Sequence, residues 1–145
     1  MRAASTPGRP RERGSVLMLM PAAVLVLVVL GAIAVDSAVV FMAQRDLVSG
    51  AQAAANDAAA YGIDEAAFRA GLGYRYDPAR VERAIDGALA ARRVTATHRW
   101  FRRGDRIVVV LDTSVEYIFA QAVPGGPTRT TVHARADARL QDAPP

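Results

Sequence analysis

The longest apolar run in the chain covers residues 15–35 and contains no charge, SVLMLMPAAVLVLVVLGAIAV. As a helix rising about 1.5 Å per residue it would be roughly 31 Å long, which is about the thickness of a bilayer's hydrocarbon core. Arg9, Arg11 and Arg13 precede the run, whereas Arg45 is the nearest basic residue after it. The positive-inside rule therefore predicts a single-pass anchor with a cytoplasmic N-terminus and an extracytoplasmic C-terminal domain.

Two other interpretations of the apolar run stay open. A cleaved secretory signal is indicated by Ala32-Ile33-Ala34, an A-x-A site, although the run is longer than the usual apolar region of about 7–15 residues. A prepilin-type leader is indicated by Gly14, which follows basic residues and directly precedes Ser15. Such leaders usually have an acid at the fifth mature position, which here is Leu19. Cleavage between Gly14 and Ser15 would therefore depart from the usual pattern.

The helix is predicted to continue beyond the apolar run, to about Tyr61. Residues 37–62 contain no proline and are rich in alanine, the strongest helix former. Apolar residues such as Val40 and Leu47 continue a helical stripe, and Gly62 is expected to end the helix in left-handed geometry. The second half of this helix would project from the membrane.

Small side chains recur every four residues in this extension, at Gly50, Ala54, Ala58 and Gly62. Such a seam lets another helix approach closely. The alternative is that alanine is present only as a helix former. Gly50 favours the seam, because glycine costs about 1 kcal/mol in a helix interior.

Asp36 is the first charged residue after the apolar run and joins the seam as a candidate helix-packing residue. One interpretation makes it an interfacial stop residue, where a carboxylate costs much less than the roughly 2.5–3.5 kcal/mol expected at mid-bilayer. The other pairs it with an arginine of a partner helix within the membrane.

Residues 63–145 are predicted to form a small α+β domain. A short helix is expected at 64–72, and an amphipathic helix at 78–92 with Asp77 as its N-cap. Strand patterns at 94–101, 106–119 and 128–140 favour a three-stranded antiparallel meander, with a turn at 102–105. In the last strand five alternate residues are expected to face inward, Val132, Ala134, Ala136, Ala138 and Leu140.

The predicted fold class is thus a membrane-anchored α+β protein in three parts. Residues 1–14 form a cytoplasmic basic tail, residues 15–62 form the transmembrane helix and its alanine-rich extension, and residues 63–145 form the extracytoplasmic domain. Charge supports this division. The tail carries four arginines against one acid, whereas residues 44–145 carry fourteen arginines against twelve acids, a net charge of 14 − 12 = +2. That balance argues against a nucleic-acid-binding domain.

The sequence offers no constellation for catalysis. The chain has no cysteine, and His98 and His133 lack further ligands at metal-binding spacing. Asp112 and Glu116 would lie roughly 13 Å apart on a strand, and Ser114 lacks a G-x-S-x-G context. We therefore expect a non-enzymatic protein with no cofactor, no bound metal and no small-molecule substrate.

A basic and aromatic cluster occurs in the predicted hairpin, where the candidate surface-binding residues are Arg99, Trp100, Arg102, Arg103 and Arg106. Such a surface could bind lipid headgroups or an anionic wall polymer outside the cell, where nucleic acid is not expected. The alternative is a solvated, arginine-edged hairpin that resists edge pairing.

Residues 12–62 contain several motifs together: Arg13-Gly14 at the start, Pro21 early in the apolar helix, Ala34-Val35-Asp36, Gln44-Arg45-Asp46-Leu47, and the alanine-rich 51–60. In this combination the segment resembles the N-terminal segment of TadE/TadG-like Flp (tight adherence) pilus-assembly proteins of the actinobacterial type. Leu19 in place of an acid resembles an uncleaved TadG-like anchor more than a processed TadE-like protein.

The resemblance implies a membrane-anchored structural or assembly component of a Flp/Tad-type pilus or secretion apparatus, similar to minor pilins and pseudopilins. Its implied partners are membrane lipid and other proteins of that machinery, which it would meet through its N-terminal helix. The alternative function is an exported cell-envelope binding module that uses the arginine- and tryptophan-rich hairpin.

Overall fold

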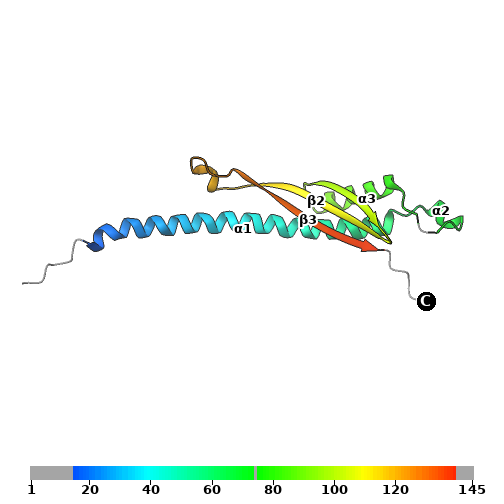
Figure 1. The fold of residues 1–145 in the computed structure, drawn as a ribbon, viewed down its shortest axis with the longest axis horizontal. Coiled ribbons are helices and arrows are strands. Elements are labelled where there is room, and N and C mark those ends of the chain that lie inside the picture. The colour runs from blue at the N-terminus through cyan, green and yellow to red at the C-terminus, as the bar shows by residue number, and fades with distance from the viewer. Residues whose placement is uncertain (1–14, 74, 140–145) are drawn as a thin grey trace, which may run out of the picture.

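The computed structural model describes residues 15–73 and 75–139. Gly14 of the candidate leader site and Leu140 of the predicted inward face lie outside these residues. The elements in chain order are α1 (Ser15–Tyr61), α2 (Glu65–Arg69), α3 (Pro78–Ala91), β1 (Thr97–Arg103), β2 (Arg106–Glu116), the 3-10 helix η2 (Ala120–Ala122) and β3 (Arg129–Arg139). Figure 1 shows that the molecule is a long rod, with the sheet and α3 lying along one half of α1.

Helix α1 runs unbroken for 47 residues and includes Pro21, as the sequence predicted. Its first half stands clear of the folded domain (Figure 1). The large apolar side chains there are exposed, namely Leu19, Met20, Val24, Leu25, Val26, Leu27, Val28, Val29, Leu30, Ile33 and Val35. Among the described residues, α1 is the one helix long and apolar enough to cross a membrane. The fold is therefore compatible with a single-pass membrane protein.

The sheet is an antiparallel meander in the order β1-β2-β3, which confirms the predicted topology. Strand β1 continues to Arg103, so the hairpin turn is Gly104-Asp105 and not the predicted 102–105; Gly104 has φ +65°, which favours glycine. Strand β2 ends at Glu116 instead of continuing to 119. The Tyr117 N–H still donates to the Thr128 carbonyl, but the amides of residues 118–120 bind a side chain of α1.

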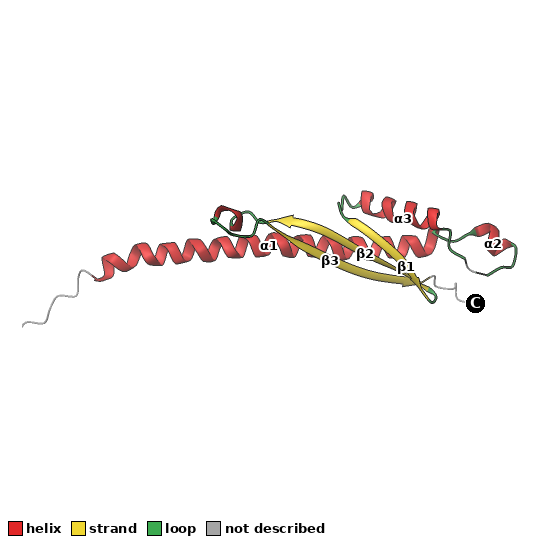
Figure 2. Ribbon diagram, turned by 45° about the horizontal axis from the view of Figure 1, so that its top comes forward, coloured by secondary structure: helices red, strands yellow, loops and turns green. Residues whose placement is uncertain are grey.

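Helices α1 and α3 lie side by side on one face of the sheet (Figure 2). The core between them contains residues of all three elements: Leu47, Ala51, Ala54 and Ala58 of α1, Val81, Ile85 and Leu89 of α3, and Ile107, Val109 and Leu111 of β2. Strand β3 adds Val132, Ala134 and Ala136, the inward residues that its alternating pattern predicted. The alanines of α1 let its axis approach the sheet closely, so the helix forms the centre of the domain.

The predicted start of α3 is confirmed: Asp77 Oδ1 accepts the Ala79 N–H at 2.9 Å, and Pro78 occupies the first turn. The earlier helix is only five residues long, with Asp64 as its N-cap. The expectation for Gly62 was wrong, because Gly62 does not have a positive φ. Glycine is needed there for space, as the next subsection shows.

Candidate functional site

Asp36 lies where the exposed apolar half of α1 meets the folded domain. Its side chain is only 7% exposed. Oδ1 accepts the backbone N–H groups of Ile118 at 2.7 Å and Phe119 at 3.0 Å, and Oδ2 accepts that of Ala120 at 2.8 Å. Charge-assisted bonds of this kind are stronger than neutral ones. Neither interpretation of Asp36 predicted these partners, which are amides of the same chain.

The segment that binds Asp36 is the β2–β3 loop, residues 117–128, with the uncharged sequence YIFAQAVPGGPT. Two of the three amides precede η2 and the third is that of its first residue, Ala120, at a helix start where N–H groups have no partner within so short a helix. Gly126 packs tightly inside the loop, since a Cβ atom there would lie 2.2 Å from the Ala120 carbonyl oxygen. The loop is thus a compact structure fastened to α1.

The small-residue seam of α1 packs against α3 of the same chain. Ala54 and Ala58 are fully buried. A Cβ atom at Gly50 would lie 3.3 Å from Val94 Cγ2, and one at Gly62 would lie 2.4 Å from the Ala58 carbonyl oxygen and 2.5 Å from Val81 Cγ2. The seam therefore serves helix packing, and the helix that fills it is α3, which leaves no room there for a second chain.

The pleat of the sheet divides the hairpin cluster between two faces. Trp100 turns toward α3, where its Nε1–H donates to Glu82 Oε1 at 2.7 Å. Arg102 turns the same way, with its guanidinium 5.8 Å from the centroid of the Tyr76 ring. Register places Arg99, Arg103 and Arg106 on the opposite face. The five residues therefore do not form one binding surface, because neighbours along a strand point in opposite directions.

Glu82 on α3 links this helix to β1 through two side chains. Besides Trp100, it contacts His98, whose Nε2 is 2.7 Å from Glu82 Oε2. The hydrogen bond with His98 lowers the pKa of the Glu82 carboxyl, and the bond from Trp100 adds to this effect against an opposing rise from burial. The arrangement holds the edge strand on α3. The carboxylate's hydrogen-bonding oxygens are thereby occupied.

Several arginines of the domain lie close together on the outer face of the sheet. Cross-strand pairing brings Arg135 opposite Val110 and Arg139 opposite Arg106, beside the three outward arginines of the hairpin. We call Arg99, Arg103, Arg106, Arg135 and Arg139 the arginine face. Phe101 lies within it, 5.6 Å from the Arg135 guanidinium, and Arg106 pairs with Asp137. Arg135 and Arg139 were not among the predicted surface-binding residues, although their outward alternation in the last strand was visible in the sequence.

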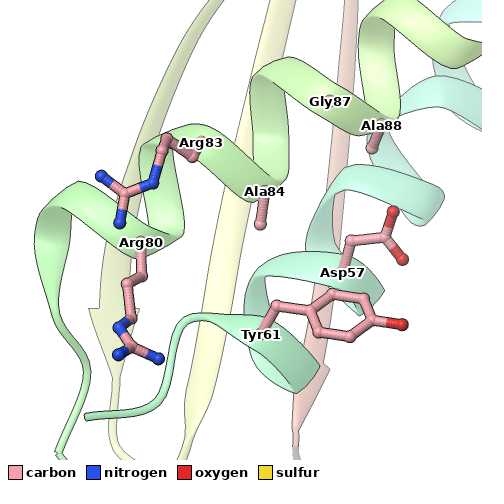
Figure 3. A pocket seen from close by; sticks show the side chains of 7 residues that line it. All are labelled: Asp57, Tyr61, Arg80, Arg83, Ala84, Gly87 and Ala88. Carbon is pink, nitrogen blue, oxygen red and sulfur yellow. The ribbon is translucent and has the colours of Figure 1, made fainter.

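A shallow hollow lies between the end of α1 and α3, with Asp57 and Tyr61 on one side and Arg80 and Arg83 on the other (Figure 3). It has no arrangement of acid, base and nucleophile. Arg80 is engaged in ion pairs with Glu65 at 3.3 Å and Asp77 at 3.7 Å. The hollow is therefore a gap between two packed helices, and its side chains do not form a reactive site.

Within residues 15–73 and 75–139, no group of three or more histidine and acidic side chains could hold a metal ion. The geometry thus defines an elongated α+β domain fastened to a protruding apolar helix. Comparisons with protein-family models, with curated proteins and with solved structures give no match to this chain.

Proposed function

We propose that this chain is a non-enzymatic, single-pass membrane protein whose role is structural. One observation carries the proposal: a single unbroken helix provides both the exposed apolar segment and the centre of the folded domain. An anchor joined to its domain by a flexible linker would leave the domain free to turn. Here the domain is coupled rigidly to the anchor, as a component that holds position relative to a membrane would require.

The proposed orientation has the basic N-terminal tail in the cytoplasm and the domain outside. It is supported by Arg9, Arg11 and Arg13 before the apolar run. Protease added to spheroplasts should then digest the folded domain and leave a short membrane-protected fragment. A domain that resists protease until the membrane is lysed would contradict this orientation.

We further propose that the protein belongs to a Flp/Tad-type pilus or secretion apparatus, either as a minor-pilin-like subunit or as a TadG-like anchor. The support is the resemblance of residues 12–62. Since α3 fills the seam at residues 50–62, contacts with other machinery proteins would use the exposed part of α1, which includes Leu27, Phe41 and Met42. These side chains suit either lipid or a partner helix.

Deletion of the gene in a piliated strain tests this assignment, with pili counted by electron microscopy and the wild-type gene supplied in trans as control. Pili of unchanged number and length would contradict it. Neighbouring genes that encode a pilus ATPase and two polytopic membrane proteins would support it. The mass and first residue of the protein extracted from membranes distinguish an intact anchor (Met1) from a processed prepilin (Ser15) or a cleaved secretory signal (Val35).

A second candidate function is binding of an anionic envelope polymer or lipid headgroup, and the arginine face supports it. Arg99 and Arg103 are exposed and lie on one face beside Phe101. Replacing both with glutamine should reduce retention on isolated envelope fragments. The matched control replaces Arg83 of α3 and Arg92, the C-cap of α3, with glutamine, which changes the charge equally away from the sheet. Equal retention of the two double variants would contradict binding by the arginine face.

A further inference from the structure

The β2–β3 loop exposes three large apolar side chains together. Ile118, Phe119 and Val123 are 50%, 46% and 60% exposed. The loop has no charged residue between Glu116 and Arg129, which form an ion pair at 3.6 Å at its base. An uncharged apolar surface bounded by charges is typical of a contact site for another protein or a membrane.

The position of the loop along α1 indicates what the exposed apolar side chains of the loop contact. The loop lies beside the end of the apolar run (Figure 1). A groove between them is lined by Ile33 and Phe41 of α1 and by Tyr117 and Pro127 of the loop. If residues 15–35 cross the hydrocarbon core, which their length of roughly 31 Å matches, Ile33 and Asp36 lie at its outer boundary. The loop then lies at that same level.

The burial of Asp36 fits this position. A free carboxylate on the lipid-facing side of the helix would resist entry into the bilayer surface. Three amides of the loop bind it, which covers the charge and leaves the apolar side chains of the loop outermost. Continuity with the apolar helix thus favours lipid as the occupant of this surface over another protein.

We propose that the β2–β3 loop lies in the outer interfacial layer of the bilayer and inserts Ile118, Phe119 and Val123 among the lipids. The inference rests on the proposed membrane anchoring. It adds a second point of contact with the bilayer, which would restrict the tilt and rotation of α1 and its attached domain relative to the membrane. Aromatic and aliphatic side chains at the boundary are suited to this environment.

Single-cysteine depth measurements test the proposal directly, because the chain has no native cysteine. A spin label is placed at Ile33→Cys, Val123→Cys or Leu72→Cys in the full chain, reconstituted in vesicles of phosphatidylcholine and phosphatidylglycerol. Leu72 is the matched control, since its exposure of 57% resembles the 60% of Val123 but it lies at the far end of the domain. Trp100 fluorescence confirms that each variant is folded.

The readout is the ratio of collision rates with oxygen, which concentrates in the bilayer, and with a water-soluble nickel chelate. The expected order is Ile33 highest, Val123 intermediate and Leu72 lowest. A ratio at Val123 equal to that at Leu72, with a high ratio at Ile33, would overturn the loop inference and leave the anchor intact. A low ratio at all three positions would overturn the anchor itself.

Discussion

Two glycine-to-alanine substitutions should change the stability of the domain in opposite directions. Gly62→Ala adds a methyl group just after the end of α1, against Ala58 of α1 and Val81 of α3. Gly87→Ala adds the same group to α3, where nothing lies within 4 Å of the new atom. The pair separates the tight packing around Gly62 from the effect of the added methyl group itself, because the chemical change is identical.

The magnitude follows from the contacts at each position. At Gly62 the added Cβ would lie 2.4 Å from the Ala58 carbonyl oxygen and 2.5 Å from Val81 Cγ2. Ordinary contacts are about 3.5–4.0 Å, so the helix end must move by roughly 1 Å, and overpacking of this kind costs about 1–3 kcal/mol. At Gly87 the helix interior gains about 1 kcal/mol from the higher helix propensity of alanine. The two variants should therefore differ by about 2–4 kcal/mol in the free energy of unfolding.

The assay is thermal unfolding of the full chain in detergent micelles, followed by the fluorescence of Trp100, the one tryptophan of the chain. Trp100 reports the packing of α3 on the domain, because it lies in β1 and donates to Glu82 of α3. For a domain of this size, 1 kcal/mol corresponds to about 4–8 °C in Tm. The Tm of Gly62→Ala should fall by roughly 10 °C, and that of Gly87→Ala should rise by a few degrees. A Gly62→Ala variant as stable as the wild type would refute the packing argument.

Two further predictions concern contacts far apart in the sequence. Asp36→Ala removes the acceptor of three loop amides, and Gly126→Ala disturbs the loop at the Ala120 carbonyl. In both variants the amides of residues 118–120 should exchange hydrogen at least about tenfold faster than in the wild type, while the amides of β2 keep their protection. Unchanged exchange in Asp36→Ala would show that the carboxylate does not hold the loop. The second prediction is a pH dependence, because the pKa of Glu82 is lower in the folded state than in the unfolded state. The Glu82 carboxylate therefore contributes its full stabilisation above the unfolded pKa of about 4.5, and this stabilisation is lost as the pH falls through the folded pKa. The Tm of Glu82→Gln should thus be lower than that of the wild type at about pH 7, and the two Tm values should approach each other at about pH 3. The difference should be modest, because Glu82 is half exposed. A difference in Tm that stays constant with pH would contradict this role.

Much of the backbone could be predicted from local pattern. An apolar run followed by an alanine-rich stretch without proline predicts one long helix, and α1 ends at the expected Tyr61. Asp77-Pro78 placed the start of α3 because an N-cap acts within three residues of itself. Alternation in the last strand assigned Val132, Ala134 and Ala136 to the core, since successive side chains point to opposite faces.

Local sequence pattern did not predict the contacts of a side chain whose partner belongs to another helix or strand. The hairpin cluster looked like one surface in sequence, but the pleat sends Trp100 to α3 and Arg99 outward. Gly62 was correctly marked as the end of a helix, although for the wrong reason: the Ala58 carbonyl oxygen and Val81, and not a left-handed φ, exclude a side chain there. The seam was correctly associated with helix packing, but the sequence did not show that α3 of the same chain would occupy it.

By itself, the sequence determined the elements: a helix long and apolar enough to span a bilayer, an amphipathic helix and three strands, because each depends on residues only a few positions apart. The tertiary structure alone decided what Asp36 binds. Its partners lie 82 to 84 positions away in the sequence. Nothing in the sequence around Asp36 identifies the loop as its partner, and nothing in the loop sequence identifies Asp36. They meet because the sheet packs along α1 and carries the end of β2 to the level of Asp36, where a buried carboxylate and unpaired amides satisfy each other.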